Sequence, residues 1–233
     1  MADNLAAVHR RMAAACAAAG RPPDSVRLLA VSKTHGPEAV RAAAAAGQVL
    51  FGENRVQEAA AKMPECPVHL QWHLIGHLQR NKAAQAAQLF DWVHSVDSIK
   101  LLEALDRHAA EAGRRLDVLV QVNVSGERSK SGLAPEALPA VLARGNELPN
   151  VQVRGLMTIP PLTEDPEKAR PHFRALRELR DRWAAELGMD LDELSMGMTH
   201  DLEIAIGEGA TIVRVGTAIF GERARPAKGA EPA

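Results

Sequence analysis

Hydrophobic positions along the chain follow two alternating patterns. Short runs rich in Val, Ile and Leu are typical of buried strands, and the longer stretches between them repeat their hydrophobic positions with helical period. The predicted strands are 26–32, 49–51, 71–75, 92–95, 118–124, 152–159, 193–196 and 211–215. The predicted helices are 4–19, 37–46, 56–62, 81–89, 99–112, 135–146, 166–187 and 201–207. One helix therefore precedes an alternation that repeats eight times.

This alternation predicts the fold class. Two consecutive strands joined through a helix run parallel, because the crossover needs about a dozen residues and has a fixed right hand. Eight such units favour an α/β fold, namely a single (β/α)8 TIM-type barrel with an extra N-terminal helix. A doubly wound open sheet is the alternative that the pattern leaves open. We expect one domain over 1–223 and a flexible C-terminal tail over 224–233, where the periodicity is lost.

Charge and composition narrow the function. The formal net charge is -1 and the basic residues do not cluster, so we expect neither nucleic acid nor a membrane surface as a partner. No stretch reaches the roughly 18 uninterrupted apolar residues of a membrane span. Cys16 and Cys66 lack metal-ligand or disulfide-framework spacing, which favours the reducing cytoplasm and predicts no metal site. The alanine-rich stretch 12–19 loosely resembles a signal peptide, but Ala forms helices well and inserts poorly into membranes.

Lys33 directly follows the first predicted strand, at the end of a barrel where functional residues collect. A lysine held against apolar walls shifts its pKa readily, and the neutral amine so favoured is the nucleophile of Schiff-base formation. The alternative is a lysine that ends an edge strand and extends into water. We interpret Lys33 as a candidate binding residue for an aldehyde.

A second group of residues suits a phosphate. Gly216 and Thr217 follow the eighth predicted strand, and Thr199 lies at the start of the helix predicted after the seventh. Barrel phosphate sites are often built from these two loops, where backbone N–H groups and a helix N-terminus face the anion. Glycine allows close backbone approach, and threonine adds a hydroxyl donor. The alternative is that Thr199 is only an N-cap and Gly216 only a turn glycine.

Seven sequence blocks, in order from residue 29 to residue 221, carry a resemblance to a known family. They are Leu29-Ala30-Val31-Ser32-Lys33-Thr34, Phe51-Gly52-Glu53-Asn54 with Val56-Gln57-Glu58, Trp72-His73-Leu74-Ile75-Gly76-His77-Leu78-Gln79, Ser129-Lys130-Ser131-Gly132, Arg154-Gly155-Leu156-Met157-Thr158-Ile159, Gly197-Met198-Thr199-His200-Asp201, and Val213-Arg214-Val215-Gly216-Thr217-Ala218-Ile219-Phe220-Gly221. With these blocks the chain resembles the pyridoxal phosphate homeostasis protein family, also described as proline synthase co-transcribed homologues.

The resemblance implies a barrel like the N-terminal domain of alanine racemase, with pyridoxal 5′-phosphate (PLP) as cofactor. Lys33 would carry PLP as an aldimine, Thr199 with the backbone of Gly216 and Thr217 would hold the phosphate, and Arg214 would face the pyridine nitrogen. The residues that the resemblance assigns to the cofactor pocket are Lys33, Asn54, His73, Met157, Thr199, Arg214, Gly216 and Thr217.

Two positions depart from the family's usual residues. The residue after Phe-Gly-Glu-Asn is usually Tyr and here is Arg55, which we expect to point to solvent. The residue after Gly-Met is usually Ser and here is Thr199. Because threonine keeps the hydroxyl, phosphate binding is expected to survive this change.

The residues favour a carrier of the cofactor over an enzyme. A guanidinium only donates hydrogen bonds, so a pyridine nitrogen facing Arg214 stays unprotonated and is a poorer electron sink. The related racemases resemble two-base machines with a tyrosine from a second domain, whereas this sequence has no tyrosine and ends shortly after the eighth strand. We therefore expect a cytoplasmic protein of PLP (vitamin B6) homeostasis that stores, buffers or delivers PLP without catalysis. We expect it to be a monomer that contacts PLP-dependent apo-enzymes only transiently.

Other readings remain open at this point. His35, His77 and His200 lie in predicted loops at the same rim and could relay a proton in a PLP-dependent, racemase-like enzyme. A Schiff-base aldolase acting on a phosphorylated sugar would use the same lysine and phosphate loops. A scaffold for partner proteins has no residue-level support. For Arg214, the alternative is a structural ion pair beneath the barrel mouth.

Overall fold

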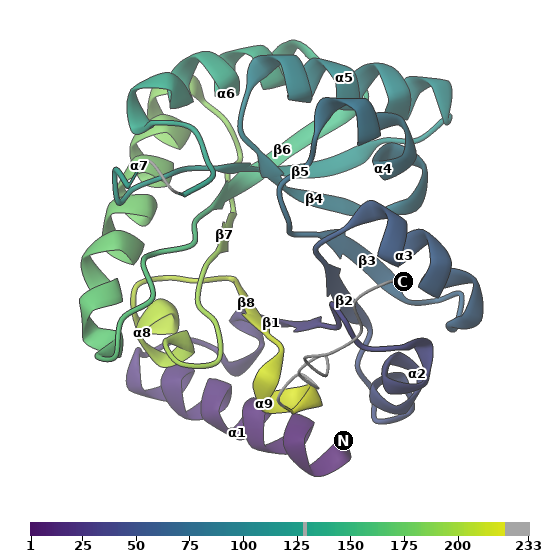
Figure 1. The fold of residues 1–233 in the computed structure, drawn as a ribbon. Coiled ribbons are helices and arrows are strands. Elements are labelled where there is room, and N and C mark those ends of the chain that lie inside the picture. Colours follow the sequence, from purple (N-terminus) through teal and green to yellow (C-terminus); the bar gives the residue numbers. More distant parts are fainter. Residues whose placement is uncertain (128–129, 222–233) are drawn as a thin grey trace, which may run out of the picture.

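Eight parallel strands close into a barrel in the computed structural model, which describes residues 1–127 and 130–221 (Figure 1). Each strand pairs with the next along the chain, and β8 pairs with β1 to complete the ring. The strands are β1 (Arg27–Val31), β2 (Leu50–Glu53), β3 (Gln71–Leu74), β4 (Trp92–Val96), β5 (Leu116–Gln121), β6 (Val151–Met157), β7 (Glu193–Ser195) and β8 (Ile212–Val215). The closed ring confirms the predicted barrel and excludes the doubly wound sheet. Because a closed barrel has no edge strand, the alternative that Lys33 ends an edge strand is excluded.

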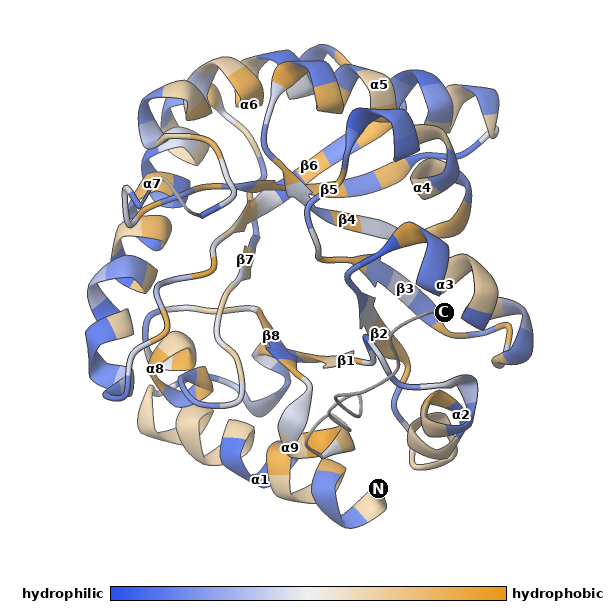
Figure 2. Ribbon diagram, in the orientation of Figure 1, coloured by the Kyte–Doolittle hydropathy of each residue, from blue (hydrophilic) through white to orange (hydrophobic). Residues whose placement is uncertain are grey.

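Helices form an outer layer around the barrel, and one of them precedes the first strand (Figure 1). The helices are α1 (Ala2–Ala18), α2 (Pro37–Ala45), α3 (Val56–Lys62), α4 (Ala83–Leu89), α5 (Ile99–Glu111), α6 (Leu138–Glu147), α7 (Arg170–Leu187), α8 (Leu202–Gly207) and α9 (Thr217–Phe220). In α5, Ser98 caps the N-terminus and the buried face carries Leu101, Leu105 and Ala109 at helical spacing. Figure 2 shows such helices as orange and blue residues in alternation, as expected for a layer between core and solvent.

The apolar core lies mainly between the strands and the helices. One cluster of buried side chains joins both layers, with Phe51 and Phe173 among the largest. Inside the barrel the apolar clusters are small, and one of them consists of Trp92, Leu119 and Met157. Figure 2 shows hydrophilic positions on β3 and β5 as well. The fully buried His73, His94 and Ser195 are hydrogen-bonded to one another across β3, β4 and β7, so the barrel interior is partly polar.

The predicted elements differ from the observed ones mainly at their ends. The fifth strand stops at Gln121 rather than at 124. Val122 still donates to the Met157 carbonyl of β6, but it also forms a bridge with Leu133 of the returning chain, and the regular pairing ends there. The helix predicted over 166–187 begins with a separate 3-10 turn over Pro166–Ala169. The four residues of α9 are too few to show a helical period, so the sequence did not predict them. The predicted tail over 224–233 and Ser129 lie outside the described residues.

The N-terminal helix α1 packs against the last described helices of the chain. Its buried residues recur at helical spacing, and the helix contacts α8 and α9 (Figure 1). These buried residues are Leu5, Val8, Met12, Ala15 and Cys16. The stretch that loosely resembles a signal peptide thus belongs largely to a packed helix of the barrel. Within residues 1–127 and 130–221, no helix is long and apolar enough to cross a membrane.

Candidate functional site

A cavity of about 650 Å³ opens at the carboxyl ends of the strands, where barrel sites lie. Its walls come from segments far apart in the sequence, which meet because parallel strands place their carboxyl ends on one face of the barrel. Six of the eight predicted site residues line this cavity: Lys33, Asn54, Thr199, Arg214, Gly216 and Thr217.

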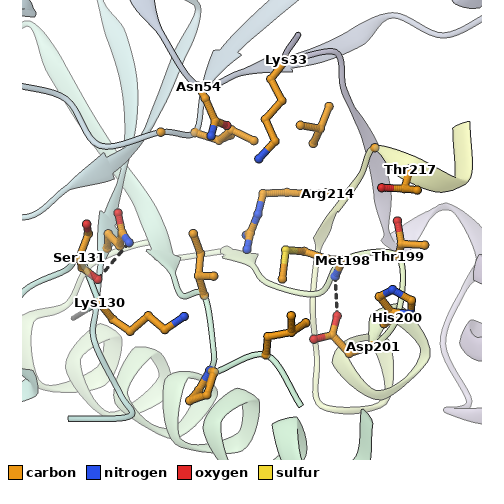
Figure 3. A pocket seen from close by; sticks show the side chains of 18 of the residues that line it. Lys33, Asn54, Lys130, Ser131, Met198, Thr199, His200, Asp201, Arg214 and Thr217 are labelled. Carbon is orange, nitrogen blue, oxygen red and sulfur yellow. Dashed lines mark hydrogen bonds between the residues drawn. The ribbon is translucent and has the colours of Figure 1, made fainter. Parts of the chain in front are cut away.

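Lys33 enters the cavity from the end of β1. Its amine points into the cavity toward Arg214 (Figure 3). The next residue, Thr34, has a φ of 68°, a left-handed conformation that non-glycine residues rarely adopt, and the chain turns sharply here toward α2. Val31 and Ile75 line the cavity as well. The apolar walls that the Schiff-base hypothesis requires for this lysine are therefore present.

A buried ion pair lies directly behind the Lys33 turn. The Lys62 ammonium is 2.5 Å from Glu53 Oε1 and donates to the Ser32 carbonyl at 2.8 Å. The Ser32 hydroxyl donates to the same carboxylate oxygen at 2.6 Å. Glu53 is fully buried, and its Oε2 has no hydrogen-bond partner in the described part of the chain. This cluster holds the backbone that leads into Lys33. The sequence did not predict it, because its two charges meet only when α3 folds back onto β2.

Arg214 lies deep in the same cavity. Its side chain donates from Nη1 to Ser195 Oγ at 2.7 Å and from Nη2 to the Thr158 carbonyl at 2.9 Å. Burial lowers the pKa of the guanidinium to about 10, while the nearby Asp201 carboxylate acts in the opposite direction, so Arg214 stays charged at neutral pH. Its two partners are neutral oxygens rather than a carboxylate, which argues against the structural ion pair. A guanidinium has five N–H donors, so others are left for a ligand.

A buried chain of hydrogen bonds extends from Arg214 into the barrel. Ser195 Oγ lies 3.0 Å from His94 Nδ1, and His94 Nε2 lies 2.8 Å from His73 Nδ1. Burial lowers the pKa of His73 to about 3 and that of His94 well below its usual value. Both imidazoles are therefore neutral at neutral pH. Since Arg214 only donates, the Ser195 oxygen accepts a hydrogen bond from it, and the Ser195 hydroxyl can donate one to His94.

His73 and Met157 lie below the cavity rather than in its wall, so the structure does not bring them together with the other six residues, and a place for them in the cofactor pocket stays a prediction. Both are 0% exposed, and the His73 ring stacks on Trp92 with 5.4 Å between ring centroids. The residues two positions later, Ile75 and Ile159, line the cavity instead. Alternate residues of a strand face the same side. The inward-facing residue nearest the end of the strand therefore forms the cavity wall, and the inward-facing residue two positions earlier lies deeper inside the barrel.

Thr199 and Thr217 lie next to each other at one side of the cavity (Figure 3). The chain reaches Thr199 through Gly197, whose φ is 91°, and a Cβ at Gly197 would lie 2.5 Å from the Cβ of Ala205. Only glycine fits such a position. A Cβ at Gly216 would lie 3.2 Å from a backbone oxygen of β1, so this residue is also closely packed. The two predicted phosphate loops are thus brought together.

The turn that carries Thr199 is closed by Asp201. The predicted helix begins at Leu202 with Asp201 as its N-cap, so Thr199 precedes the helix instead of starting it and is not its N-cap. Asp201 Oδ1 accepts from the Met198 N–H at 2.6 Å, and burial raises the pKa of this carboxyl group. Asp201 also lines the cavity. From the sequence we assign Asp201 no role, since it is only the first residue of the helix predicted over 201–207.

Further polar residues lie at the rim of the cavity. Lys130 points inward from the loop after β5 (Figure 3). Of the three rim histidines, His77 and His200 line the cavity, and His77 Nδ1 lies 3.3 Å from Asp97 Oδ2. His35 does not line it but stacks on the ring of Phe220 in α9.

The remaining predictions about the site concern Arg55 and metals. Arg55 is exposed and pairs with Glu58 at 3.1 Å, which confirms that it points to solvent. Among residues 1–127 and 130–221, no group of three or more His, Cys, Asp or Glu side chains could hold a metal ion.

Comparisons with known proteins show the family of this chain. The sequence matches the alanine racemase N-terminal domain family over residues 4–224. It is 50% identical, over 224 residues, to the pyridoxal phosphate homeostasis protein of Pseudomonas aeruginosa, a match that covers 96% of each chain. The chain belongs to the family of pyridoxal phosphate homeostasis proteins. The resemblance carried by the seven sequence blocks is thereby confirmed.

Other pyridoxal phosphate homeostasis proteins and solved structures agree. The protein of this name from Aquifex aeolicus is 46% identical over 222 residues, covering 95% of this chain and 97% of its own. PipY of Synechococcus elongatus PCC7942, solved with PLP bound, is 44% identical with a TM-score of 0.84, covering 94% of this chain and 99% of PipY. PipY without PLP has a TM-score of 0.87, covering 95% of this chain and 100% of PipY.

Proposed function

We propose that this chain binds PLP in the cavity and serves PLP homeostasis in the cytoplasm as a carrier or buffer, not as an enzyme. The observation that carries the proposal is the meeting of Lys33, Arg214 and the Thr199–Thr217 pair in one cavity of about 650 Å³. That volume lies within the range of small-molecule sites. The PLP bound in PipY and the name of the relatives support PLP over a sugar phosphate. Nothing comparable supports the aldolase alternative.

The residues fit the three polar parts of the cofactor. When bound, PLP supplies an aldehyde that a lysine amine can attach covalently, and Lys33 offers that amine. For the phosphate, Thr199 and Thr217 provide hydroxyl donors. Gly216, which has no side chain, lets the phosphate approach the backbone closely. Arg214 offers N–H donors for the ring nitrogen. Asn54, at the end of β2, adds a polar side chain to the same wall.

The environment of Arg214 favours storage of PLP over catalysis. Its guanidinium is backed by Ser195 and by the neutral imidazoles of His94 and His73, a chain without a carboxylate. A ring nitrogen that faces this donor must accept a hydrogen bond, so it remains unprotonated and withdraws electrons poorly. The sequence also contains no tyrosine for a two-base racemase. The rim histidine His77, beside Asp97, is the strongest remaining candidate for a second base, so racemisation has to be tested directly.

The first experiment is the visible absorption spectrum of the purified protein, followed by borohydride reduction and mass mapping. We expect a yellow protein whose reduced adduct maps to Lys33. Lys33→Ala should lose the covalent adduct, whereas Lys100→Ala, an exposed lysine of α5, should keep it. A colourless protein that cannot be loaded with PLP would refute the proposal.

Catalysis and partners need separate measurements. Incubation of the loaded protein with a panel of amino acids should give no turnover, and turnover that disappears in Lys33→Ala would overturn the carrier role. We propose that the protein is a monomer that contacts PLP-dependent apo-enzymes only transiently. Light scattering of the purified protein should give the monomer mass, and mixing the loaded protein with a PLP-free enzyme should transfer PLP without a stable complex.

A further inference from the structure

The N-terminal helix α1 is hydrogen-bonded to one loop that the proposed function assigns to the phosphate, at Thr199, and to the short helix α9 that begins at the other, at Thr217. Arg11 Nη2 donates to the carbonyl oxygen of Thr199 at 2.8 Å. Asn4 Nδ2 donates to the carbonyl oxygen of Ile219 in α9 at 2.9 Å. One bond thus joins α1 to the turn after β7, and the other joins it to the last described helix. Neither residue lines the cavity, so α1 acts on these loops from outside.

The guanidinium of Arg11 is held in a defined orientation. Its Nε lies 2.7 Å from Glu203 Oε1, and its Nη2 lies 3.0 Å from Glu203 Oε2. Such a two-point pair fixes the plane of the guanidinium, which a lysine ammonium could not reproduce. The same Nη2 then reaches the Thr199 carbonyl. Glu203 therefore orients Arg11, and Arg11 in turn restrains the Thr199 peptide group.

The pair contributes little to overall stability. The side chains of Arg11 and Glu203 are 36% and 42% exposed, and ion pairs at such positions are weak in water. The turn that Arg11 contacts is also held from the side of the cavity. Gly197 packs closely against Ala205 there, and the Met198 N–H donates a hydrogen bond to Asp201. Arg11 thus supplies the restraint on the outer side of a turn whose inner side lines the cavity.

We infer that Arg11 is a positioning residue for the phosphate group of the bound ligand. By fixing the Thr199 carbonyl, it holds the Thr199 hydroxyl and backbone in the pose that binds a phosphate monoester, and Asn4 does the same for the Thr217 loop through α9. This inference rests on the proposed function. It adds that recognition of the phosphate, as distinct from the ring and aldehyde, depends on the N-terminal helix.

The test compares PLP with pyridoxal, which is the same molecule without the phosphate. Dissociation constants for both are measured by absorbance titration of the full chain and of Arg11→Met, which keeps the apolar stem of the side chain. We expect the PLP constant to rise about tenfold, as for loss of a charge-assisted hydrogen bond, and the pyridoxal constant to change less than about twofold. Arg10→Met, an exposed neighbour on the same helix, should change neither. Arg11→Lys should restore part of the loss, because its single nitrogen keeps the positive charge but cannot reproduce the two-point pair of Nε and Nη2 with Glu203.

Each outcome decides between the inference and its alternatives. An equal loss for PLP and pyridoxal would show a general structural effect and overturn the inference, as would no loss for either ligand. If Arg11→Met does not fold, Asn4→Ala provides the same selective comparison for the other loop. Wild-type protein that binds no PLP would refute the proposed function itself. Wild-type protein that binds PLP while Arg11→Met binds it equally well would refute only the role of Arg11.

Discussion

Lys62→Met tests the buried ion pair behind the Lys33 turn. The change removes the cation that contacts the fully buried Glu53 and keeps an unbranched side chain in its place. Removing one partner of a buried pair leaves an uncompensated charge and typically costs about 3–5 kcal/mol. Because the Ser32 hydroxyl still donates to Glu53 at 2.6 Å, we expect a free energy of unfolding lower by about 3 kcal/mol. In a protein of this size, that corresponds to a Tm lower by roughly 6–12 °C.

Urea unfolding followed by circular dichroism, together with Tm, measures this effect. Lys100→Met, at an exposed position of α5, is the matched control and should change stability by less than about 0.5 kcal/mol. The double variant Glu53→Met/Lys62→Met should regain at least about 2 kcal/mol over Lys62→Met, because a hydrophobic replacement of a whole buried pair is often neutral. A double variant no more stable than Lys62→Met, or a single variant that loses less than about 1 kcal/mol, would refute this reasoning.

Three further results are expected. Burial lowers the pKa of His73 to about 3, so below about pH 6.5 the unfolded state takes up a proton that the native state does not. The free energy of unfolding is therefore highest above pH 6.5, and it should fall by about 2 kcal/mol between there and pH 5. His94 acts in the same direction, and urea midpoints measured between pH 7 and 5 should fall less steeply in His73→Gln. Gly197→Ala should destabilise the protein by about 1–3 kcal/mol and weaken PLP binding, because the left-handed φ and the contact with Ala205 both oppose a Cβ; unchanged Tm and PLP affinity would contradict this. Both cysteines, including the fully buried Cys16, should resist Ellman's reagent in native protein and react after unfolding; rapid reaction of the folded protein would contradict their burial.

Predictions about the cavity were most successful at the strand ends. Lys33, Thr199 and Gly216 all line it, because the carboxyl ends of parallel strands necessarily share one face of a barrel. Depth along a strand was less predictable. His73 lies one layer too deep to reach the cavity, since how far each strand extends depends on the stagger of its neighbours in the closed ring. A sequence signal for the buried polar chain did exist, because His94 lies inside a strand that also contains Trp92, Val93 and Val96.

The amino-acid sequence by itself determined the alternation of strands and helices, the closed parallel barrel that this alternation favours, and the family to which the chain belongs. These features depend on hydrophobic period and on local blocks of residues, both of which can be recognised along the chain. The tertiary structure alone decided which polar side chains meet. Glu53 with Lys62, and Arg11 with Thr199, become partners only after the helices pack on the closed barrel. Their distances depend on the closure of the whole ring, and no local pattern in the sequence encodes that geometry.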